Sequence, residues 1–394
     1  MFAVLANARK AIALFFALTA LVILAACEPV SLGGIGGGGP SINTSAPVPV
    51  ALLVPRGGGN SGDDLLAQSL ENAARLAISD LEGASIDLRV YSTGGSPAQA
   101  QAQALQAVSD GAKIILGPVY GEEANAVAVA VAPKGINVLS FSNNTTIAGG
   151  NLFILGPTFQ NTANRLVSYA ARHGKDRIVI AHDSTVAGQL GRNAIQNAIG
   201  RSGATLAGTV SYDFSQQGVV SAIPEIRSAV SSGGANALFL TANTAGAMPL
   251  FSQLLPEAGV RPETTQYIGL TRWDIPAQTL ELPGVQGGWF AMPDPTMTAR
   301  FSSRYNTAFS GQPHPIGGLA YDGIAAIGAL VKAGKRDALT ASALTQGAGF
   351  QGVNGILRLR SDGTNERGLA VAQIRDKQVV IIDQAPRSFD GLGF

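Results

Sequence analysis

The sequence has few of the residues that carry redox, metal or acid–base chemistry. Among 394 residues there is one cysteine and only three histidines, and charged residues make up 13%. One cysteine cannot form an internal disulfide or a cysteine-rich zinc site. The 27 basic and 26 acidic residues balance, and no long basic run occurs, which argues against nucleic acid as a partner. We therefore expect no metal, no cofactor and no nucleic acid.

The histidines do not form a catalytic pattern. His173, His182 and His314 are not at metal-ligand spacing, and no Gly-x-Ser-x-Gly turn follows a predicted strand. A Ser-His-Asp set could be assembled around His182 and Asp183, but any chain with this many serines allows such a choice. We expect a protein that is not an enzyme.

The single cysteine ends an apparent export signal. Arg9 and Lys10 precede an uncharged apolar run over residues 11–26, which is short for a membrane span. Leu24-Ala25-Ala26-Cys27 resembles the bacterial lipobox, whose cysteine is acylated after cleavage. An ordinary signal peptide that contains a cysteine is the alternative. In lipoproteins, Asp after the cysteine favours the inner membrane, so Glu28 favours an outer-membrane anchor facing the periplasm.

After this signal the chain divides into a tether and a long region of alternating strands and helices. Residues 28–46 are rich in glycine and lack hydrophobic periodicity, as in a flexible linker. From Val48 onward, continuous apolar runs such as 48–54 alternate with amphipathic helical patterns such as 63–81. The alternation restarts after Gly156-Pro157. This pattern predicts an α/β fold with two mostly parallel sheets.

One glycine-rich loop matches a nucleotide-binding pattern. Gly57, Gly59 and Gly62 fit G-x-G-x-x-G between a predicted strand and a predicted helix. Asp63 and Asp64 follow at once and place negative charge where a phosphate would bind. This favours a mobile loop at the mouth of a cleft over a nucleotide site.

Polar residues recur where the predicted strands end. In α/β folds, ligands bind at the carboxyl ends of parallel strands. Hydroxyls, amides, one guanidinium and aromatic rings suit a small polar ligand, although each residue alone is also ordinary turn chemistry. The predicted cleft set is Tyr120, Gly121, Ser142, Asn143, Asn144, Asp183, Ser184, Asn243, Thr244, Arg272, Trp273 and Asp274.

Several short motifs resemble the type I periplasmic binding proteins, in particular the leucine-binding branch. They are the opening strand at 51–55, the Gly-Pro turn at 114–118, the strand at 137–142, the helix pair spanning 301–323, and the closing glycines at 352–363. The resemblance implies two α/β lobes joined by three crossovers that close on a ligand. The expected division is signal peptide 1–26, lipidated cysteine and tether 27–46, lobe one 47–158 plus 289–360, and lobe two 159–288 plus 361–390.

The site departs from the amino-acid binders of that family. Gly121 stands where a hydroxyl would hold a carboxylate, Ala187 replaces an aromatic ring, and Arg272 lies near the position of an acidic anchor. These departures, with the lipobox and the tether, resemble more closely the penicillin-binding-protein activators, lipoproteins that share the fold and stimulate peptidoglycan synthases. That resemblance implies a peptidoglycan synthase as partner. The alternative is a substrate-binding lipoprotein for an ABC importer of amino acids or amides, with an ABC permease as partner.

Overall fold

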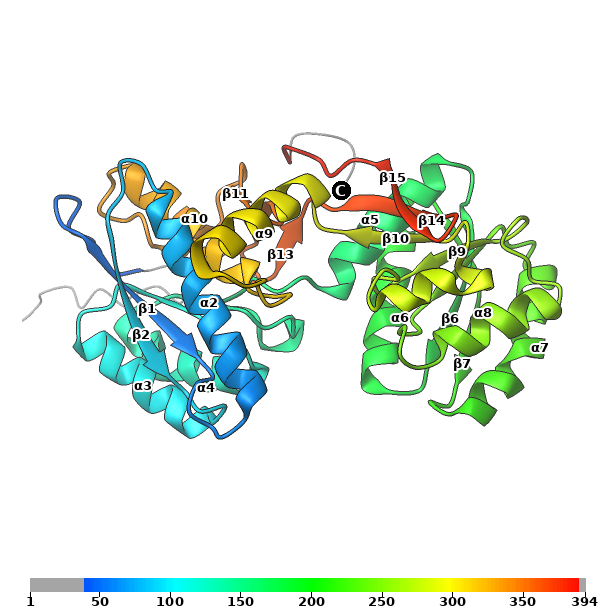
Figure 1. The fold of residues 1–394 in the computed structure, drawn as a ribbon, viewed down its shortest axis with the longest axis horizontal. Coiled ribbons are helices and arrows are strands. Elements are labelled where there is room, and N and C mark those ends of the chain that lie inside the picture. The colour runs from blue at the N-terminus through cyan, green and yellow to red at the C-terminus, as the bar shows by residue number, and fades with distance from the viewer. Residues whose placement is uncertain (1–38, 390–394) are drawn as a thin grey trace, which may run out of the picture.

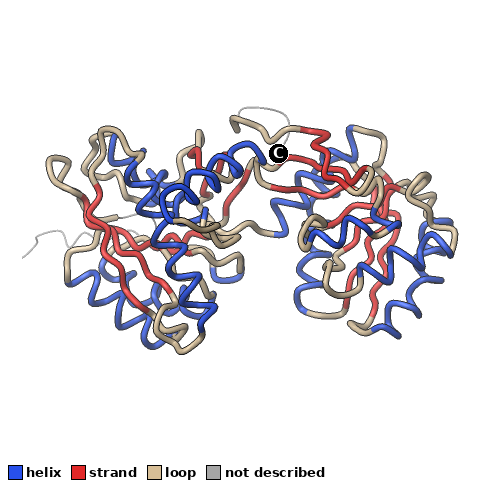
Figure 2. Tube along the Cα trace, in the orientation of Figure 1, coloured by secondary structure: helices blue, strands red, loops and turns tan. Residues whose placement is uncertain are grey.

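The structure, a computed structural model, describes residues 39–389. The predicted lipidation site, Cys27, lies outside the described residues. Two lobes lie side by side and are joined along one edge (Figure 1). In each lobe a central sheet is flanked by helices (Figure 2), so the predicted α/β fold with two parallel-sheet lobes is confirmed.

Lobe 1 is built on a five-stranded parallel sheet in the order β2-β1-β3-β4-β5. Every residue of β1 except Pro49 is buried, because helices cover both faces of the sheet. Val50 and Leu52 pack towards one core, and Ala51 and Leu53 towards the other, as alternation along a strand requires. The strands are β1 (Val48–Val54), β2 (Ile86–Ser92), β3 (Ile114–Leu116), β4 (Val138–Ser140) and β5 (Leu152–Ile154).

Helices α2, α9 and α10 cover the first face of this sheet, and α3 and α4 the second. A short α11 and a three-stranded antiparallel sheet, β11-β12-β13, complete the lobe. The helices are α2 (Ser61–Ser79), α3 (Pro97–Ser109), α4 (Gly121–Val131), α9 (Pro295–Phe309), α10 (Gly318–Lys332) and α11 (Ala341–Leu344). The small-sheet strands are β11 (Phe350–Gly352), β12 (Gly355–Leu359) and β13 (Asn365–Arg367).

Lobe 2 is built on a seven-stranded sheet in the order β15-β14-β10-β9-β8-β6-β7. Strands β6 to β10 are parallel, and β14 and β15 extend the sheet as an antiparallel pair. Helices α5 and α6 cover one face, and α7 and α8 the other. The strands are β6 (Arg177–Asp183), β7 (Thr205–Tyr212), β8 (Ala237–Leu240), β9 (Gln266–Gly269), β10 (Trp289–Met292), β14 (Ala370–Arg375) and β15 (Gln378–Asp383). The helices are α5 (Phe159–Arg172), α6 (Val186–Ser202), α7 (Gln216–Ser232) and α8 (Met248–Glu257).

Two of the chain crossings differ from the expected division. The predicted boundary before residue 289 places β10 in lobe 1, but β10 pairs with β9 and β14 in the lobe 2 sheet. The predicted boundary after residue 360 places β13 in lobe 2, but β13 pairs with β12 in lobe 1. By strand pairing, the three crossovers are therefore residues 155–158, 293–294 and 368–369.

Buried polar side chains hold the crossovers together. Asn365 donates from Nδ2 to the backbone oxygens of Ile154 (2.7 Å) and Gly156 (2.9 Å). Arg367 donates from Nε to the oxygen of Leu155 at 3.1 Å and pairs with Asp322 at 3.0 Å. The Arg367 and Asp322 side chains are 4% and 0% exposed, so this ion pair is part of the lobe 1 core beside the first crossover.

Candidate functional site

A pocket of about 610 Å³ lies between the lobes. One wall is the loop after β4 in lobe 1, the floor is the start of α5 at the first crossover, and the other wall is α6 of lobe 2. Its lining has amides, hydroxyls and apolar groups and no charged side chain: Asn143, Asn144, Thr145, Thr146, Thr158, Phe159, Gln160, Val186, Ala187, Leu190, Asn193, Ala194 and Asn197.

The lobe 1 wall brings together three of the predicted cleft residues. A Cβ on Gly121 would lie 3.3 Å from Nδ2 of Asn144 and 3.6 Å from Oγ of Ser142. Ser142 Oγ accepts a hydrogen bond from the Asn144 backbone at 3.1 Å. Asn144 Oδ1 in turn accepts from the backbone of Thr146 at 3.0 Å. Gly121, Ser142 and Asn144 therefore form one cluster, in which Asn144 lines the pocket and its orientation is fixed by neighbours.

The Gly-Pro turn that precedes this wall is shaped by close backbone packing. Gly117 has φ +91°, and a Cβ there would lie 2.3 Å from the backbone oxygen of Leu53. Only glycine fits this conformation and this space. The turn leads into α4, whose first residue is Gly121.

Tyr120 lies at the edge of lobe 1 and does not line the interlobe pocket. Its hydroxyl donates to the carboxylate of Asp63 in the first turn of α2. This hydrogen bond, together with burial, raises the pKa of Tyr120 to about 12. The ring is 39% exposed, so Tyr120 ties α4 to α2 while it keeps one face in solvent.

Glu123 is a buried acid whose place the sequence analysis did not predict. It is 1% exposed in the first turn of α4, and its carboxylate has only weak contacts, with the Thr93 side chain and the Tyr120 backbone. Burial raises its pKa and outweighs the opposite effect of Thr93 and Tyr120, and nearby Asp63 adds to the rise. Nothing in the sequence distinguishes this buried acid from the exposed Glu122 beside it.

The glycine-rich loop at 57–62, which matches the nucleotide-binding pattern, is hydrogen-bonded to residues at the start of α2. Asn60 caps α2 and accepts from the backbone of Gly62 at 3.0 Å. Asp64 accepts from the backbone of Gly57 at 3.0 Å. Two N–H groups that could bind a phosphate are thus bonded to the side chains of Asn60 and Asp64. Asp63 and Asp64 also place negative charge at this helix N-terminus, which disfavours a phosphate there.

In lobe 2, the carboxylate of Asp183 at the end of β6 is bonded to Thr185, which caps α6, and does not line the pocket. Its Oδ1 accepts from the backbone of Thr185 at 3.0 Å and from the Thr185 hydroxyl. A Cβ on Gly188 would lie 2.5 Å from the same Oδ1, so glycine is required where the carboxylate folds back. His182 Nδ1 lies 2.8 Å from the backbone oxygen of Asp183 and has no bond to its carboxylate. Ser184 is exposed next to these residues.

The loops after β8 and β9 form a separate group. Thr244 donates from Oγ1 to the backbone oxygen of Ile275 at 2.7 Å, which joins the two loops. Asn243 is exposed in the same loop. Arg272 and Asp274 bond to each other, with Nε 2.9 Å from Oδ1. None of these four residues lines the interlobe pocket.

Trp273 is a correction to the predicted cleft set. Its side chain is 0% exposed and belongs to the core between the lobe 2 sheet, α7 and α8. Cβ atoms on Gly269 and Gly288 would each lie 2.2 Å from its ring atoms, so two glycines make room for the indole. Trp273 was predicted to line the cleft because it follows a strand end, but its ring fills the core of lobe 2.

Comparison with known proteins agrees with this architecture. A family model described as periplasmic binding protein matches residues 47–378. No curated protein sequence matches the chain. Among solved structures, a putative branched-chain amino acid ABC transporter protein from Rhodospirillum rubrum has a TM-score of 0.72 at 17% identity, covering 86% of this chain and 100% of that one.

Two further solved structures share the fold. A branched-chain amino acid ABC transporter ligand-binding protein from Burkholderia xenovorans has a TM-score of 0.66 at 18% identity and covers 87% of this chain and 97% of its own. A substrate-binding protein from Desulfitobacterium hafniense, in complex with Leu, has a TM-score of 0.61 at 18% identity and covers 86% and 100%. With the family match over most of its length, the chain belongs to the periplasmic binding protein family.

Proposed function

We propose that this protein is the substrate-binding component of an ABC importer and holds a small, uncharged polar ligand between its lobes. The observation that carries the proposal is the pocket of about 610 Å³ that both lobes line. Its structural relatives are named as ABC transporter binding proteins, which supports a permease as partner. The protein binds and releases its ligand without chemical change.

The lining of the pocket supports a neutral ligand. It presents five amides and three threonine hydroxyls beside apolar side chains, and no side chain that would pair with a carboxylate or an ammonium group. Transfer of a charged group into such a pocket without a partner is unfavourable. Amide side chains both donate and accept hydrogen bonds, so they match a ligand amide or urea group. We therefore favour amides over free amino acids.

Calorimetric titration of the purified mature protein tests this proposal. The panel contains neutral aliphatic amides, and leucine, isoleucine and valine as zwitterionic comparison ligands. We expect saturable 1:1 binding of an amide at micromolar concentration and weaker binding of the amino acids. If no amide bound and leucine bound tightly, the proposal of a neutral ligand would be contradicted. The proposed role in an ABC importer would still stand.

We also propose that Cys27 anchors the protein by lipid on the periplasmic side of the membrane. No helix within residues 39–389 is long and apolar enough to span a membrane. Diacylation of the lipobox cysteine would supply stable attachment. Glu28 favours an anchor in the outer membrane. Delivery of a ligand to a permease, however, requires access to the inner membrane. Separation of the two membranes by fractionation shows which of them holds the protein.

Activation of a penicillin-binding protein is the second candidate. The observation that favours it is the lost amino-acid site: Gly121, Ala187 and Arg272 stand where the amino-acid binders place a hydroxyl, a ring and an acid. Addition of the purified protein to its host's peptidoglycan synthases should then raise glycan polymerisation or transpeptidation. Unchanged rates would remove this candidate.

A further inference from the structure

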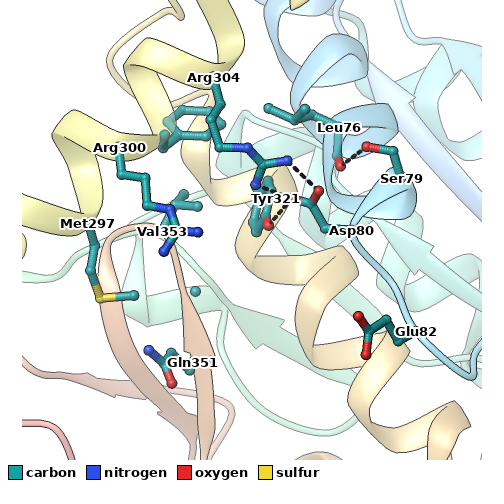
Figure 3. Close-up of a pocket in the computed structure, with 12 residues that line it drawn as sticks. Leu76, Ser79, Asp80, Glu82, Met297, Arg300, Arg304, Tyr321, Gln351 and Val353 are labelled. Carbon is teal, nitrogen blue, oxygen red and sulfur yellow. Dashed lines mark hydrogen bonds and ion pairs between the residues drawn. The ribbon is translucent and has the colours of Figure 1, made fainter.

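A second pocket lies within lobe 1 and shares no lining residue with the interlobe pocket. Its volume is about 690 Å³. Its walls are the end of α2, the side of α9, the start of α10 and the β11 turn (Figure 3). It therefore has the size of a small-molecule site and is formed by one lobe alone.

Three polar side chains on one wall satisfy one another. Arg304 donates from Nη1 to Oδ2 of Asp80 at 2.6 Å, and its other terminal nitrogen bonds Oδ1. The Tyr321 hydroxyl also donates to Asp80, at 2.5 Å. The hydrogen bond from Arg304 is the main reason why the pKa of Asp80 is lowered, so the acid stays ionised. The positive charge of Arg304 is thus matched and is not available to a ligand.

Arg300 supplies a second positive charge near Asp80 and helps to lower the pKa of that acid, so two arginines share one carboxylate. It lies four residues before Arg304 on the same face of α9, and its guanidinium points into the pocket beside Met297 and Val353 (Figure 3). Within residues 39–389 it has no hydrogen bond or ion pair. Glu82 is drawn at the opposite end of the pocket, apart from both arginines. One end of the pocket is therefore positive.

Four apolar side chains line the pocket that the exposed Arg300 enters, and two of them, Met297 and Val353, lie beside it (Figure 3). Leu76 and Phe301 are 8% and 5% exposed, and Met297 and Val353 are half-buried. A guanidinium binds a carboxylate through two parallel hydrogen bonds, and apolar walls favour a hydrocarbon body. We propose that this pocket is a second ligand site, which binds a small carboxylate that has an apolar body, with Arg300 as the anion-binding residue.

Titration of the full mature protein with hexanoate at low ionic strength tests this inference, with acetate as the matched ligand that lacks the body. We expect saturable 1:1 binding of hexanoate and at least tenfold weaker binding of acetate. Arg300→Gln should weaken hexanoate binding at least tenfold. Arg201→Gln, which changes an exposed arginine of α6 in lobe 2, should leave it unchanged.

Two further variants separate the site from alternatives. Met297→Glu, which places a negative charge beside Arg300, should also weaken hexanoate binding at least tenfold. The thermal unfolding midpoint of each variant reports whether it is folded. Asn144→Ala in the interlobe pocket should have no effect on hexanoate. The inference is overturned by absence of saturable binding, by equal affinity of wild type and Arg300→Gln, by equal affinity for acetate, or by loss of binding in Asn144→Ala alone.

Discussion

At the scale of single residues, Glu123 and Trp273 show how burial decides the role of a side chain. Glu123 occupies a helix N-terminus, where an acid is normally stabilised, but it is buried and its pKa is raised. Trp273 follows a strand end, where a ring could cover a ligand, but it fills the core. Both side chains therefore affect the stability of their lobes and not the binding of a ligand.

Replacement of Glu123 by Gln should change how stability depends on pH. Because burial raises its pKa in the folded state above 4.5, the unfolded chain loses this proton first as pH rises. The wild type should thus match Glu123→Gln near pH ~4 and be less stable by about 1–3 kcal/mol near pH ~7.5. Urea unfolding at both values checks this, with the exposed Glu122→Gln as the control. A constant difference across pH would contradict it.

Replacement of Trp273 by Ala should lower the free energy of unfolding by about 3–5 kcal/mol, because a fully buried ring is removed from between Gly269 and Gly288. Arg272→Ala, beside it on the surface, should change stability by less than about 1 kcal/mol because its partner is part-exposed. Chemical denaturation measures both. Similar small losses in the two variants would mean that the indole is not a core residue.

At the scale of elements, the crossovers between the lobes are anchored by buried side chains of both lobes. Asp322 of α10 accepts from the backbone of Val353 at 2.7 Å as well as pairing with Arg367 of β13. Arg165 of α5 donates from Nε to the backbone oxygen of Leu369 at 2.7 Å, which joins α5 to the third crossover. The lobes are thus connected by short segments with fixed ends.

Removal of one partner of the buried pair should be costly. Asp322→Asn leaves the Arg367 guanidinium buried and unpaired, so we expect a loss of about 3–5 kcal/mol of stability. The double variant Asp322→Leu, Arg367→Met removes both charges and should lose less than the sum of its two single variants. A double-mutant cycle measured by urea unfolding checks this, and strict additivity would contradict a direct interaction.

The elements that could be predicted from the sequence are those that are buried on both faces. The run Val48–Val54 is apolar on both faces, so it indicates a central parallel strand. Strand β10 was predicted in lobe 1 because the family resemblance implies a crossover just before it, whereas the pairing that places β10 beside β14 joins residues far apart in the chain. Strand-end positions were predictable, but the direction of Asp183 and Trp273 depends on Gly188 and Gly269 in three dimensions.

At the scale of the whole molecule, we propose that the two-lobed binding protein is attached to a membrane by a lipid on Cys27. Cys27→Ala should prevent acylation and release the protein from the membrane fraction. Immunoblots of the membrane and periplasmic fractions check this, with Cys27→Ser as a second variant that has the same expected result. If either variant still sediments with membranes, the anchor lies elsewhere in the chain.

The central claim is that one neutral ligand touches both lobes in the interlobe pocket. Asn144 lies on the lobe 1 wall and Asn193 on the α6 wall, so calorimetric titration of Asn144→Ala and Asn193→Ala with the best amide of the panel tests it most directly. The account predicts that each variant weakens binding by about 1–3 kcal/mol. Unchanged affinity in either variant would contradict a ligand held between the lobes.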